Sequence, residues 1–370
     1  MSNIQKNNKP NVPNLRFPEF SGEWKKSILK AECEINPKTG PLADTFQYID
    51  LESVVKGQLI KVNYLKKEDA PSRAQRVLSK WDILYQCVRP YQLNNFLVRD
   101  NSSTQRVAST GYAQIRTNNN PDFFFQLLHT QKFTGRVINR CTGTNYPAIN
   151  STDLSEIEIN IPEIKEQEKI GRMLSLIDQR IAIQNRLIEQ YESLIKAIAF
   201  EIIGRNRSNT TLSDCVFCSS STLKESELIN TGIPTYGAAG ISGYTAEALC
   251  KSDSILITKD GSGVGSKRYV HGEHSFVGTL CSLTPKDGIY LPYVYYALMI
   301  MNLDTYKTGQ AIPHIYFKDY GKLQLFCPTY SEQRRLSHGL ETLDRKVGYE
   351  ESLLLSINEV KKGLLDQLFI

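Results

Sequence analysis

The sequence predicts an α/β (α+β) fold with two mixed domains in pseudo-two-fold tandem repeat, separated by two long helices that form an antiparallel coiled coil. Two observations predict this architecture. Residues 142–204 align with residues 308–370 at a constant offset of 166 positions, without an insertion. The second part of each copy carries apolar residues at steps of three and four, which is the heptad pattern of coiled-coil helices.

The composition favours a globular protein with more than one core. The chain has 370 residues, a length at which two domains are usual, and 41% of them are hydrophobic. No apolar run is long enough to predict a membrane span. The N-terminal stretch MSNIQKNNKPNVPN is polar and lacks the apolar centre of a signal peptide. We therefore expect a loose leader, reduced cysteines and a cytoplasmic protein.

The repeat keeps residues that shape the backbone. His314 and Lys318, which at first suggest catalysis in the stretch 308–328, pair with Ala148 and Thr152 and are not kept in both copies. We interpret this stretch as the junction between a domain and its helix. The identical pairs are Thr142/Thr308, Gly143/Gly309, Pro147/Pro313, Ile149/Ile315, Asp153/Asp319, Pro162/Pro328, Glu166/Glu332, Gln167/Gln333, Leu174/Leu340, Asp178/Asp344, Leu187/Leu353 and Lys196/Lys362.

The regions before the two copies also resemble each other. WDILYQ (81–86) and DSILIT (253–258) are strand patterns, and PDFFFQLL (121–128) and LPYVYYALM (291–299) are typical of aromatic helices. Variable domains and helices therefore alternate along the chain. We divide it into a leader with the first domain (1–164), a first helix (165–205), a second domain (206–329) and a second helix (330–370).

Each long helix has a polar residue in its apolar seam. The first seam runs from Ile170 to Ile202 and is interrupted by Gln184, and the second has Glu350 at the equivalent position. A polar residue in such a seam can fix the register of a helix pair. Lys361 interrupts the second seam again, and the neighbouring Val360 is expected to shift the seam locally. Because a long helix cannot bury its seam alone, the two helices are predicted to pack against each other.

Two motifs suggest cofactor chemistry, and neither is complete. DGSGVGSK (260–267) has Ser266 where a P-loop needs its second glycine, and the next segment alternates like a strand, so we expect a hairpin with a glycine-rich turn. NYP (145–147) resembles the Asn-Pro-Pro-aromatic motif of amino-methyltransferases but has one proline. Cys215 and Cys218 form a CxxC without a second pair at zinc-ribbon spacing. No catalytic, cofactor or metal site is predicted.

Polar, basic and aromatic residues cluster in both variable domains, and the net charge of +5 permits a polyanionic partner. RAQR (73–76) and VRPYQLNNFLVR (88–99) lie in the first domain, and Lys259 and SKRYVHGEH (266–274) flank the glycine-rich turn in the second. Arg suits guanine edges, Asn and Gln suit adenine edges, and Lys suits phosphates. The candidate DNA-binding residues are Arg73, Gln75, Arg76, Arg89, Tyr91, Gln92, Asn94, Asn95, Lys259, Ser262, Lys267, Arg268 and Tyr269.

Several segments occur together in a specific combination. They are VPNLRFPEFSGEWKK (12–26), the two TG…P-x-I segments, IPEIKEQEKIGRMLSLIDQRI (161–181), IPTYGAAGISGYT (233–245), CPTYSEQRRLSHGLETLDRKV (327–347) and KKGLLDQLFI (361–370). In this combination the chain resembles, over nearly its full length, the DNA-specificity subunits of Type I restriction–modification systems. It departs from the family pattern at Cys327, where an apolar residue is usual, and at Lys361.

The resemblance implies a non-catalytic subunit with two target recognition domains. In this family each domain recognises one half of a bipartite, asymmetric sequence in double-stranded DNA, and the helices set the spacer between the halves. The helices also bind two modification subunits, which methylate adenine with S-adenosylmethionine, and two restriction subunits add ATP- and Mg²⁺-dependent translocation and cleavage. No cofactor is expected in this chain. The helix residues expected to serve spacing and partner binding are Glu166, Gln167, Leu174, Asp178, Glu332, Gln333, Leu340 and Asp344.

Two functions from other classes stay open at this point. One is a self-contained DNA methyltransferase, which would bind S-adenosylmethionine without partners. The other is a structural coiled-coil protein, which would show no salt-dependent association with DNA even when partners are present.

Overall fold

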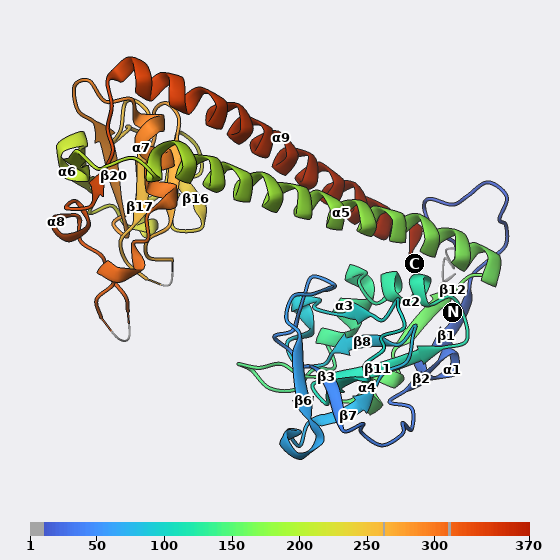
Figure 1. Cartoon of the computed structure of the whole chain (residues 1–370). Coiled ribbons are helices and arrows are strands. Elements are labelled where there is room, and N and C mark those ends of the chain that lie inside the picture. Colours follow the sequence, from blue (N-terminus) through green and yellow to red (C-terminus); the bar gives the residue numbers. More distant parts are fainter. Residues whose placement is uncertain (1–10, 262, 310–311) are drawn as a thin grey trace, which may run out of the picture. The chain divides into compact units, whose positions relative to one another are not determined.

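A computed structural model describes residues 11–261, 263–309 and 312–370 and confirms the predicted fold class. The described residues form two compact units. Unit 1 contains the described residues up to Ile183 together with Leu354–Ile370, and unit 2 contains Gln184–Leu353. Each unit includes part of both long helices, α5 (Ile164–Ala199) and α9 (Tyr330–Leu368) (Figure 1). None of the helices in the described ranges is both long and apolar enough to cross a membrane.

Unit 1 is built from short strands and short helices beside its parts of α5 and α9. Its strands are β1 (Lys25–Ile28), β2 (Cys33–Ile35), β3 (Thr45–Ile49), β4 (Val54–Val55), β5 (Gln58–Leu59), β6 (Asn63–Lys66), β7 (Ala74–Val77), β8 (Ile83–Gln86), β9 (Phe96–Leu97), β10 (Arg106–Ser109), β11 (Tyr112–Thr117) and β12 (Glu158–Ile161). Its other helices are α1 (Leu29–Glu32), α2 (Pro121–Leu127), α3 (Gln131–Ile138) and α4 (Ser151–Ser155), with 3-10 turns η1 (Lys67–Asp69) and η2 (Pro90–Gln92).

Unit 2 has the same kind of construction, and α5 continues into it as a π-helical turn, η3 (Phe200–Gly204). Its strands are β13 (Thr210–Thr211), β14 (Val216–Ser220), β15 (Ile233–Gly237), β16 (Gly240–Thr245), β17 (Ser254–Thr258), β18 (Lys267–Val270), β19 (Ser275–Phe276), β20 (Leu280–Pro285) and β21 (Gln324–Leu325). Its other helices are α6 (Leu212–Cys215), α7 (Leu291–Ile300) and α8 (Phe317–Tyr320), with 3-10 turns η4 (Glu225–Glu227) and η5 (Asp304–Tyr306).

The two units share one sheet topology. An antiparallel sheet has the order β2-β11-β8-β9 in unit 1 and the matching order β14-β20-β17-β18 in unit 2. In a second, mixed sheet, β3 lies between antiparallel β6 and parallel β10, just as β15 lies between antiparallel β16 and parallel β19. The predicted strands at 81–86 and 253–258 are the equivalent strands β8 and β17, and the predicted aromatic helices are α2 and α7. The duplication therefore includes the variable domains.

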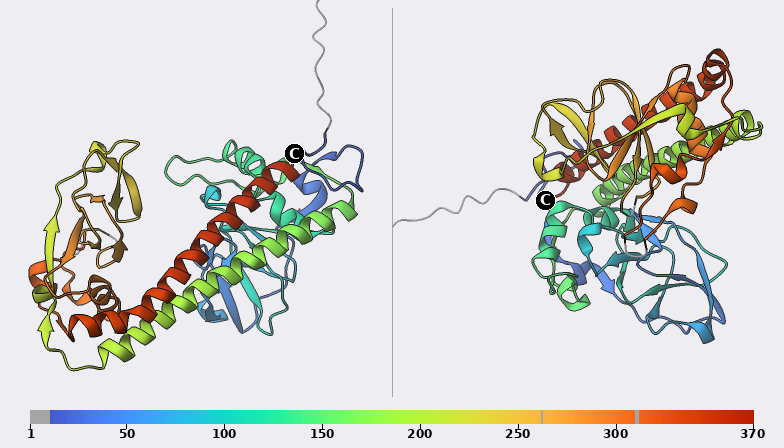
Figure 2. Two further views of the ribbon diagram at one scale, coloured as in Figure 1. Left: turned by 90° about the horizontal axis from the view of Figure 1, so that it is seen from above. Right: turned by 90° about the vertical axis from the view of Figure 1, so that its left-hand side faces the viewer.

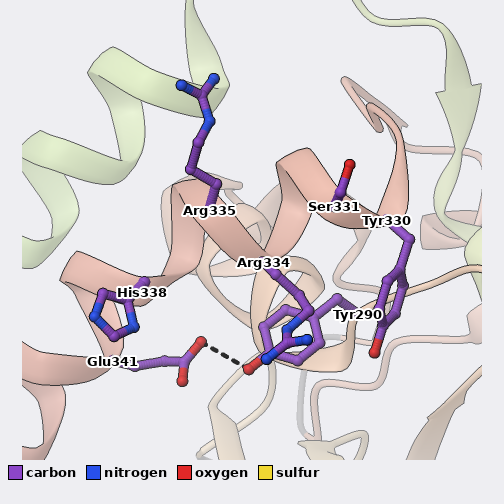
Figure 3. A pocket seen from close by; sticks show the side chains of 7 residues that line it. All are labelled: Tyr290, Tyr330, Ser331, Arg334, Arg335, His338 and Glu341. Atoms are coloured by element: carbon purple, nitrogen blue, oxygen red, sulfur yellow. Dashed lines mark hydrogen bonds between the residues drawn. The ribbon is translucent and has the colours of Figure 1, made fainter.

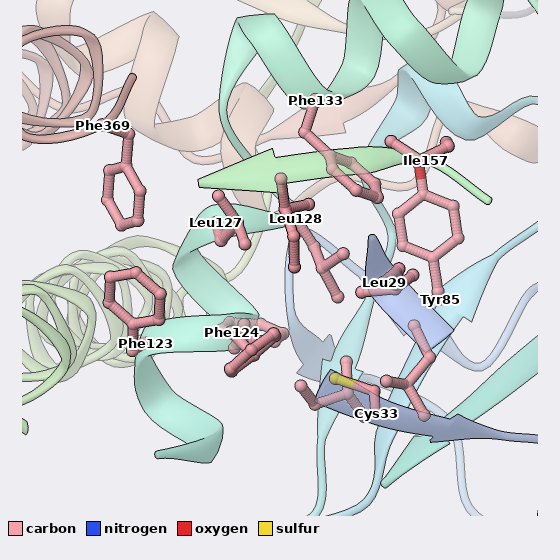
Figure 4. Close-up of a cluster of buried hydrophobic side chains, with 14 of the residues drawn as sticks. Leu29, Cys33, Tyr85, Phe123, Phe124, Leu127, Leu128, Phe133, Ile157 and Phe369 are labelled. Carbon is pink, nitrogen blue, oxygen red and sulfur yellow. The ribbon is translucent and has the colours of Figure 1, made fainter. Parts of the chain in front are cut away.

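The core of unit 1 joins its sheet to both long helices. The ring of Phe369, just after α9, lies 5.2 Å from that of Phe123 in α2 and 6.2 Å from that of Trp24, measured between centroids (Figure 4). Leu174 of α5 belongs to the same buried cluster. Burial of one such side chain stabilises a fold by about 1.5–3 kcal/mol, so this cluster holds both helices on the unit.

Both long helices begin with the same arrangement. Gln167 donates from Nε2 to the carbonyl oxygen of Pro162 over 3.0 Å, and Gln333 donates to that of Pro328 over 2.8 Å. Both glutamines are buried, and a buried amide needs a hydrogen-bond partner. The repeat therefore keeps the same side-chain-to-backbone contact at the start of both helices.

The polar residues in the two helix seams bind each other. Nε2 of Gln184 donates to Oε2 of Glu350 over 2.5 Å and to its backbone oxygen over 3.2 Å. Gln184 is 1% exposed and Glu350 is 5% exposed. The same carboxylate pairs with Lys346 at 2.6 Å. Figure 2 shows α5 and α9 as continuous helices from two further directions. Gln184 and Glu350 therefore lie inside regular helix, and their contact fixes the register of the helix pair.

The second break in the seam, Lys361, has a partner of its own. Its ammonium group pairs with Asp178 at 2.5 Å, and Asp178 also accepts a hydrogen bond from Gln126 at 2.6 Å. The expectation that the seam shifts to Val360 is wrong, because Val360 is 59% exposed whereas the Lys361 side chain is 18% exposed. The lysine stays in the seam because an acidic partner neutralises its charge there.

We predict that Gln184 and Glu350 can be replaced only together. Glu350→Leu alone removes the carboxylate acceptor of a buried amide, leaves only the longer bond to the backbone oxygen, and should lower the free energy of unfolding by about 1–3 kcal/mol. Gln184→Leu/Glu350→Leu fills the seam with apolar side chains and should restore at least the wild-type stability. Thermal unfolding of the two single variants, the double variant and the wild type gives the coupling energy. Additive losses would contradict a direct pairing.

Candidate DNA interface

Arg89 lies three residues after the end of strand β8, in a backbone conformation that few side chains adopt. Its φ is 54°, in the left-handed region, which costs a non-glycine residue roughly 1–2 kcal/mol. Its backbone N–H donates to the carbonyl oxygen of Pro147 over 2.7 Å. Its guanidinium carbon lies 4.3 Å from the ring centroid of Tyr146. Arg89 is therefore fixed at the base of the loop that carries Tyr146.

The amide candidates in the loop after β8 are engaged within unit 1. Gln92 accepts a hydrogen bond from the side chain of Gln86 over 2.8 Å. Asn94 and Asn95 accept from backbone N–H groups over 3.0 Å and 2.8 Å. Asn95 is 1% exposed, so it shapes the loop, whereas Tyr91 is 52% exposed. The sequence cluster thus separates into residues that build the loop and residues that face outward.

The candidates on and before β7 differ in exposure. Arg73 and Gln75 are exposed, and the side chain of Gln75 donates to the carbonyl oxygen of Ser72 over 2.7 Å. Arg76 is half-buried, and burial lowers the pKa of its guanidinium group. Its Nε is buried, and this N–H forms no hydrogen bond among the residues that the structure describes. Such a cation raises the local positive potential, which favours a phosphate nearby.

In unit 2 the glycine-rich segment forms the predicted hairpin. Strands β17 and β18 are antiparallel, and Thr258 bonds to Gly265 and Ser266 across the turn over 2.9 Å and 3.0 Å. The loop leads into a strand and not into the helix that a P-loop requires. Lys259 follows β17 and is half-buried. The candidate Ser262 lies outside the described residues.

The candidates on β18 have partners within unit 2. Lys267 donates from Nζ to the carbonyl oxygen of Met301 over 2.7 Å, and burial lowers the pKa of its ammonium group to about 8. The hydroxyl of Tyr269 donates to Asp253 over 2.9 Å. Arg268 lies over an aromatic ring, with 5.7 Å between its guanidinium carbon and the ring centroid of Tyr236. Lys267 and Tyr269 therefore make hydrogen bonds within unit 2, whereas Arg268 stacks on a side chain of the neighbouring sheet.

The glutamates kept in both helices have different surroundings. Glu166 is 0% exposed, and its carboxylate accepts two hydrogen bonds from Arg16 over 2.7 Å and 2.9 Å. Its repeat counterpart Glu332 is exposed and accepts from the Thr329 hydroxyl over 3.1 Å. The helix start that unit 1 covers with its N-terminal segment is thus accessible in unit 2.

The aspartates that both repeats keep also differ in their surroundings, whereas the leucines that both repeats keep do not. Asp178 binds Lys361, as described above. The repeat counterpart of Lys361 is Ile195, so the equivalent partner of Asp344 is not a lysine. Burial raises the pKa of Asp344, and the nearby Glu192 adds to the rise. Leu174 and Leu340 are both buried in the seams.

A pocket of about 480 Å³ lies beside the first turns of α9 in unit 2 (Figure 3). The hydroxyl of Tyr290 donates to Glu341 over 3.0 Å, and the guanidinium carbon of Arg334 lies 5.9 Å from the ring centroid of Tyr290. Arg335 points away from this group (Figure 3). The pocket is a basic and aromatic surface at an accessible helix start. Its remaining lining residues are Tyr330, Ser331 and His338.

Two tight hairpins lie beside the candidates, in segments that the sequence predicted to be junctions between a domain and its helix and not DNA contacts. We call residues 142–149, and the described residues 308–309 and 312–315 of the second copy, the TG hairpins. Thr142 and Ala148 exchange backbone hydrogen bonds of 2.9 Å each, and the corresponding residues of the second hairpin do so over 2.9 Å and 2.8 Å. The signal was present in the sequence, because both hairpins lie in the repeated Thr-Gly…Pro-x-Ile segment.

Metal-ligating side chains are dispersed in the described ranges. Among residues 11–261, 263–309 and 312–370, no three His, Cys, Asp or Glu side chains are grouped as ligands would be. His274, a metal candidate by residue type, lies 2.7 Å from the hydroxyl of Ser254 and 2.8 Å from the carbonyl oxygen of Gly272. Its two ring nitrogens therefore serve the structure of unit 2.

Comparison with known proteins gives one consistent family. The model of the Type I restriction modification DNA specificity domain matches residues 51–193 and again residues 210–359. A protein of Mycoplasma genitalium named as a type I specificity subunit is 28% identical over 251 residues, which are 61% of this chain and 65% of that protein. The type I restriction enzyme HindI specificity subunit of Haemophilus influenzae is 26% identical over 156 residues, which are 41% of this chain and 34% of that protein. The chain therefore spans less than two thirds of the length of these relatives.

A solved structure has a similar fold. The crystal structure of the S subunit of a Type I restriction–modification system from M. genitalium superposes with a TM-score of 0.62. The superposition covers 97% of this chain and 99% of that chain at 20% sequence identity. The similarity bears on the fold alone at this identity.

Lys267→Met should remove a pH-dependent part of the stability. Burial lowers the pKa of Lys267 from 10.5 to about 8, so the unfolded chain binds more protons between these values, and stability rises with pH in that window. The wild type should therefore gain stability relative to Lys267→Met as the pH increases from about 8 towards 10.5. Urea unfolding at both ends of the window measures the gain.

Lys267→Arg is the matched control, because a guanidinium group stays charged throughout this range. It should show no stability gain relative to Lys267→Met. If the stability of the wild type changed with pH between about 8 and 10.5 in the same way as that of either variant, the lowered pKa of Lys267 would be contradicted.

Proposed function

The chain belongs to the Type I restriction modification DNA specificity family, and on this premise we propose that it selects the DNA sequence for a Type I restriction–modification complex. The observation that carries the proposal is the duplication of a whole unit. One sheet topology, one hairpin and one helix start each occur twice. A duplicated recognition domain suits a target that itself has two parts.

Each unit would bind one half of a bipartite, asymmetric sequence in double-stranded DNA. Contacts from Arg and Lys to phosphates supply affinity, and contacts to base edges select the sequence. The candidates for these contacts that lie at the surface or partly exposed include Arg73, Gln75, Arg89 and Tyr91 in unit 1, and Lys259 and Arg268 in unit 2. In unit 1 the buried Asn95 and the amides of Gln92 and Asn94 hold the loop shape on which the contacts depend.

The chemical reactions would belong to partners. We propose that the chain is not itself an enzyme and binds no cofactor. It would recruit two modification subunits, which methylate adenine with S-adenosylmethionine, and two restriction subunits, which use ATP and Mg²⁺. The accessible start of α9, with Glu332 and the basic pocket beside it, is a surface for such a partner. A cytoplasmic location follows from the same proposal.

Mapping of methylated adenines tests this function directly. The chain is co-expressed with its modification subunit, and the methylated sites are sequenced. Exchange of residues 211–307 for the corresponding segment of another family member should change one half-site and leave the other unchanged. One contiguous site, or an unchanged pattern after the exchange, would contradict the proposal. Binding of S-adenosylmethionine by the isolated chain would support a self-contained methyltransferase instead.

The spacer between the half-sites should follow the length of the helices. Residues 185–191 of α5 face residues 343–349 of α9 if the Gln184–Glu350 contact sets the register. Deletion of both heptads shortens the helix pair by about 10 Å, at about 1.5 Å per residue, which corresponds to roughly 3 base pairs of DNA. The methylated half-sites should therefore lie about 3 base pairs closer together. Deletion of residues 185–191 alone is the control for disrupted pairing, and an unchanged spacer in the double deletion would contradict the measuring role of the helices.

A further inference from the structure

The TG hairpin of unit 1 is anchored by backbone hydrogen bonds on both of its arms. Thr142 and Ala148 close it, the carbonyl oxygen of Pro147 accepts from Arg89 over 2.7 Å, and Ile149 donates to the segment after β8 over 3.0 Å. Every one of these bonds is made by the main chain. The position of the tip is therefore fixed by the fold and not by the side chains that the tip carries.

The TG hairpin of unit 2 is anchored in the same way. The N–H of Gly261 donates to the carbonyl oxygen of Pro313 over 3.1 Å, and Ile315 donates to the carbonyl oxygen of Lys259 over 2.9 Å. Gly261 therefore takes the place that Arg89 has in unit 1. The φ of Gly261 is 94° and that of Arg89 is 54°, so the anchor requires a left-handed residue in both units.

Glycine suits that anchor position, and unit 1 nevertheless has an arginine there. A side chain in the left-handed region is strained, so an arginine that persists there indicates a use for its side chain. In unit 1 the guanidinium group covers the ring of Tyr146 at 4.3 Å. A stacked arginine keeps its N–H groups directed outward at the ring edge, where they can bind phosphate.

Both hairpins expose a large apolar side chain. Tyr146 is 64% exposed, and its repeat counterpart Ile312 is 58% exposed. One exposed apolar residue is common on a protein surface, but here the equivalent position is apolar in both repeats, each time beside the same backbone anchor. Aromatic rings that stack on bases and aliphatic wedges between base steps are the usual apolar contacts with nucleic acid.

We propose that the two TG hairpins contact the DNA directly. In unit 1 the Tyr146 ring packs against bases of one half-site, and Arg89 binds an adjacent phosphate. In unit 2 Ile312 takes the place of Tyr146 at the other half-site. The proposal rests on the proposed function, because it requires each unit to bind DNA.

The test compares three variants of the chain, each assembled with its modification subunits. Tyr146→Ala removes the ring at the tip. Arg89→Gly removes the guanidinium group and gives the anchor the residue that unit 2 has there, so folding is not impaired. Tyr349→Ala is the matched control, because Tyr349 on α9 is 63% exposed and has Lys346 over its ring at 5.1 Å. Three quantities are measured for each complex: its affinity for DNA that contains the site identified by mapping of methylated adenines, the dependence of this affinity on salt concentration, and its thermal unfolding.

Tyr146→Ala should lower the affinity about tenfold without a change in the salt dependence, because it removes stacking and no charge. Arg89→Gly should lower the affinity and reduce the slope of log K against log salt by about 0.9, the contribution of one phosphate contact. Tyr349→Ala should leave both quantities unchanged, and no variant should unfold earlier than the wild type.

Wild-type affinity and salt dependence in both Tyr146→Ala and Arg89→Gly would overturn the inference and leave the proposed function standing. A loss in Tyr349→Ala as large as that in Tyr146→Ala would overturn it as well. A wild-type complex that binds no DNA would overturn the proposed function first, and the inference with it.

Discussion

A single buried polar contact, between Gln184 and Glu350, governs how the two long helices pair. The two residues are repeat counterparts, 166 positions apart in the chain. A residue that bonds its own counterpart lies on the local two-fold axis of the helix pair. Heptad seams alone permit slips by whole heptads. A slip here would separate the buried amide of Gln184 from its carboxylate acceptor, at about 1–3 kcal/mol, so the contact favours one register.

Away from this contact the two copies diverge according to what packs on them. In unit 1 Arg16 neutralises Glu166, and Lys169 lies 4.5 Å from the ring centroid of Phe17. The counterparts of these helix residues, Glu332 and Arg335, are both exposed in unit 2. The repeat therefore keeps side chains at a helix start that one unit uses to hold its own N-terminal segment. In the other unit the equivalent side chains, Glu332 and Arg335, are exposed and accessible to a second protein.

The sequence predicted the regular parts of this fold well, because periodicity and repetition are local signals. The two long helices, the strands β8 and β17 and the helices α2 and α7 follow from apolar spacing and from the constant offset. The pairing of Lys361 with Asp178 did not follow, because it joins residues far apart in the chain, and a lysine in an apolar seam looks like a defect from the heptad alone. In the candidate interface, the polar cluster at 88–99 gave no sign of which amides turn inward. Asn95 is buried because it caps a backbone N–H of Gln86, a contact set by the path of the loop.

The two candidate interfaces combine a shared backbone with different side chains, which bears on the kind of sequence they can recognise. Arg89, Tyr146 and Ala148 in unit 1 correspond to Gly261, Ile312 and His314 in unit 2. His314 is also held by Asp260 at 2.8 Å, a contact that its alanine counterpart cannot make. Identical side chains on a two-fold repeat would favour a palindromic target, because each half would then offer the same donors and apolar surfaces. Under the proposed function, the repeat would place the two contacts at equivalent positions, and the replaced residues would make them unequal, as an asymmetric bipartite target requires.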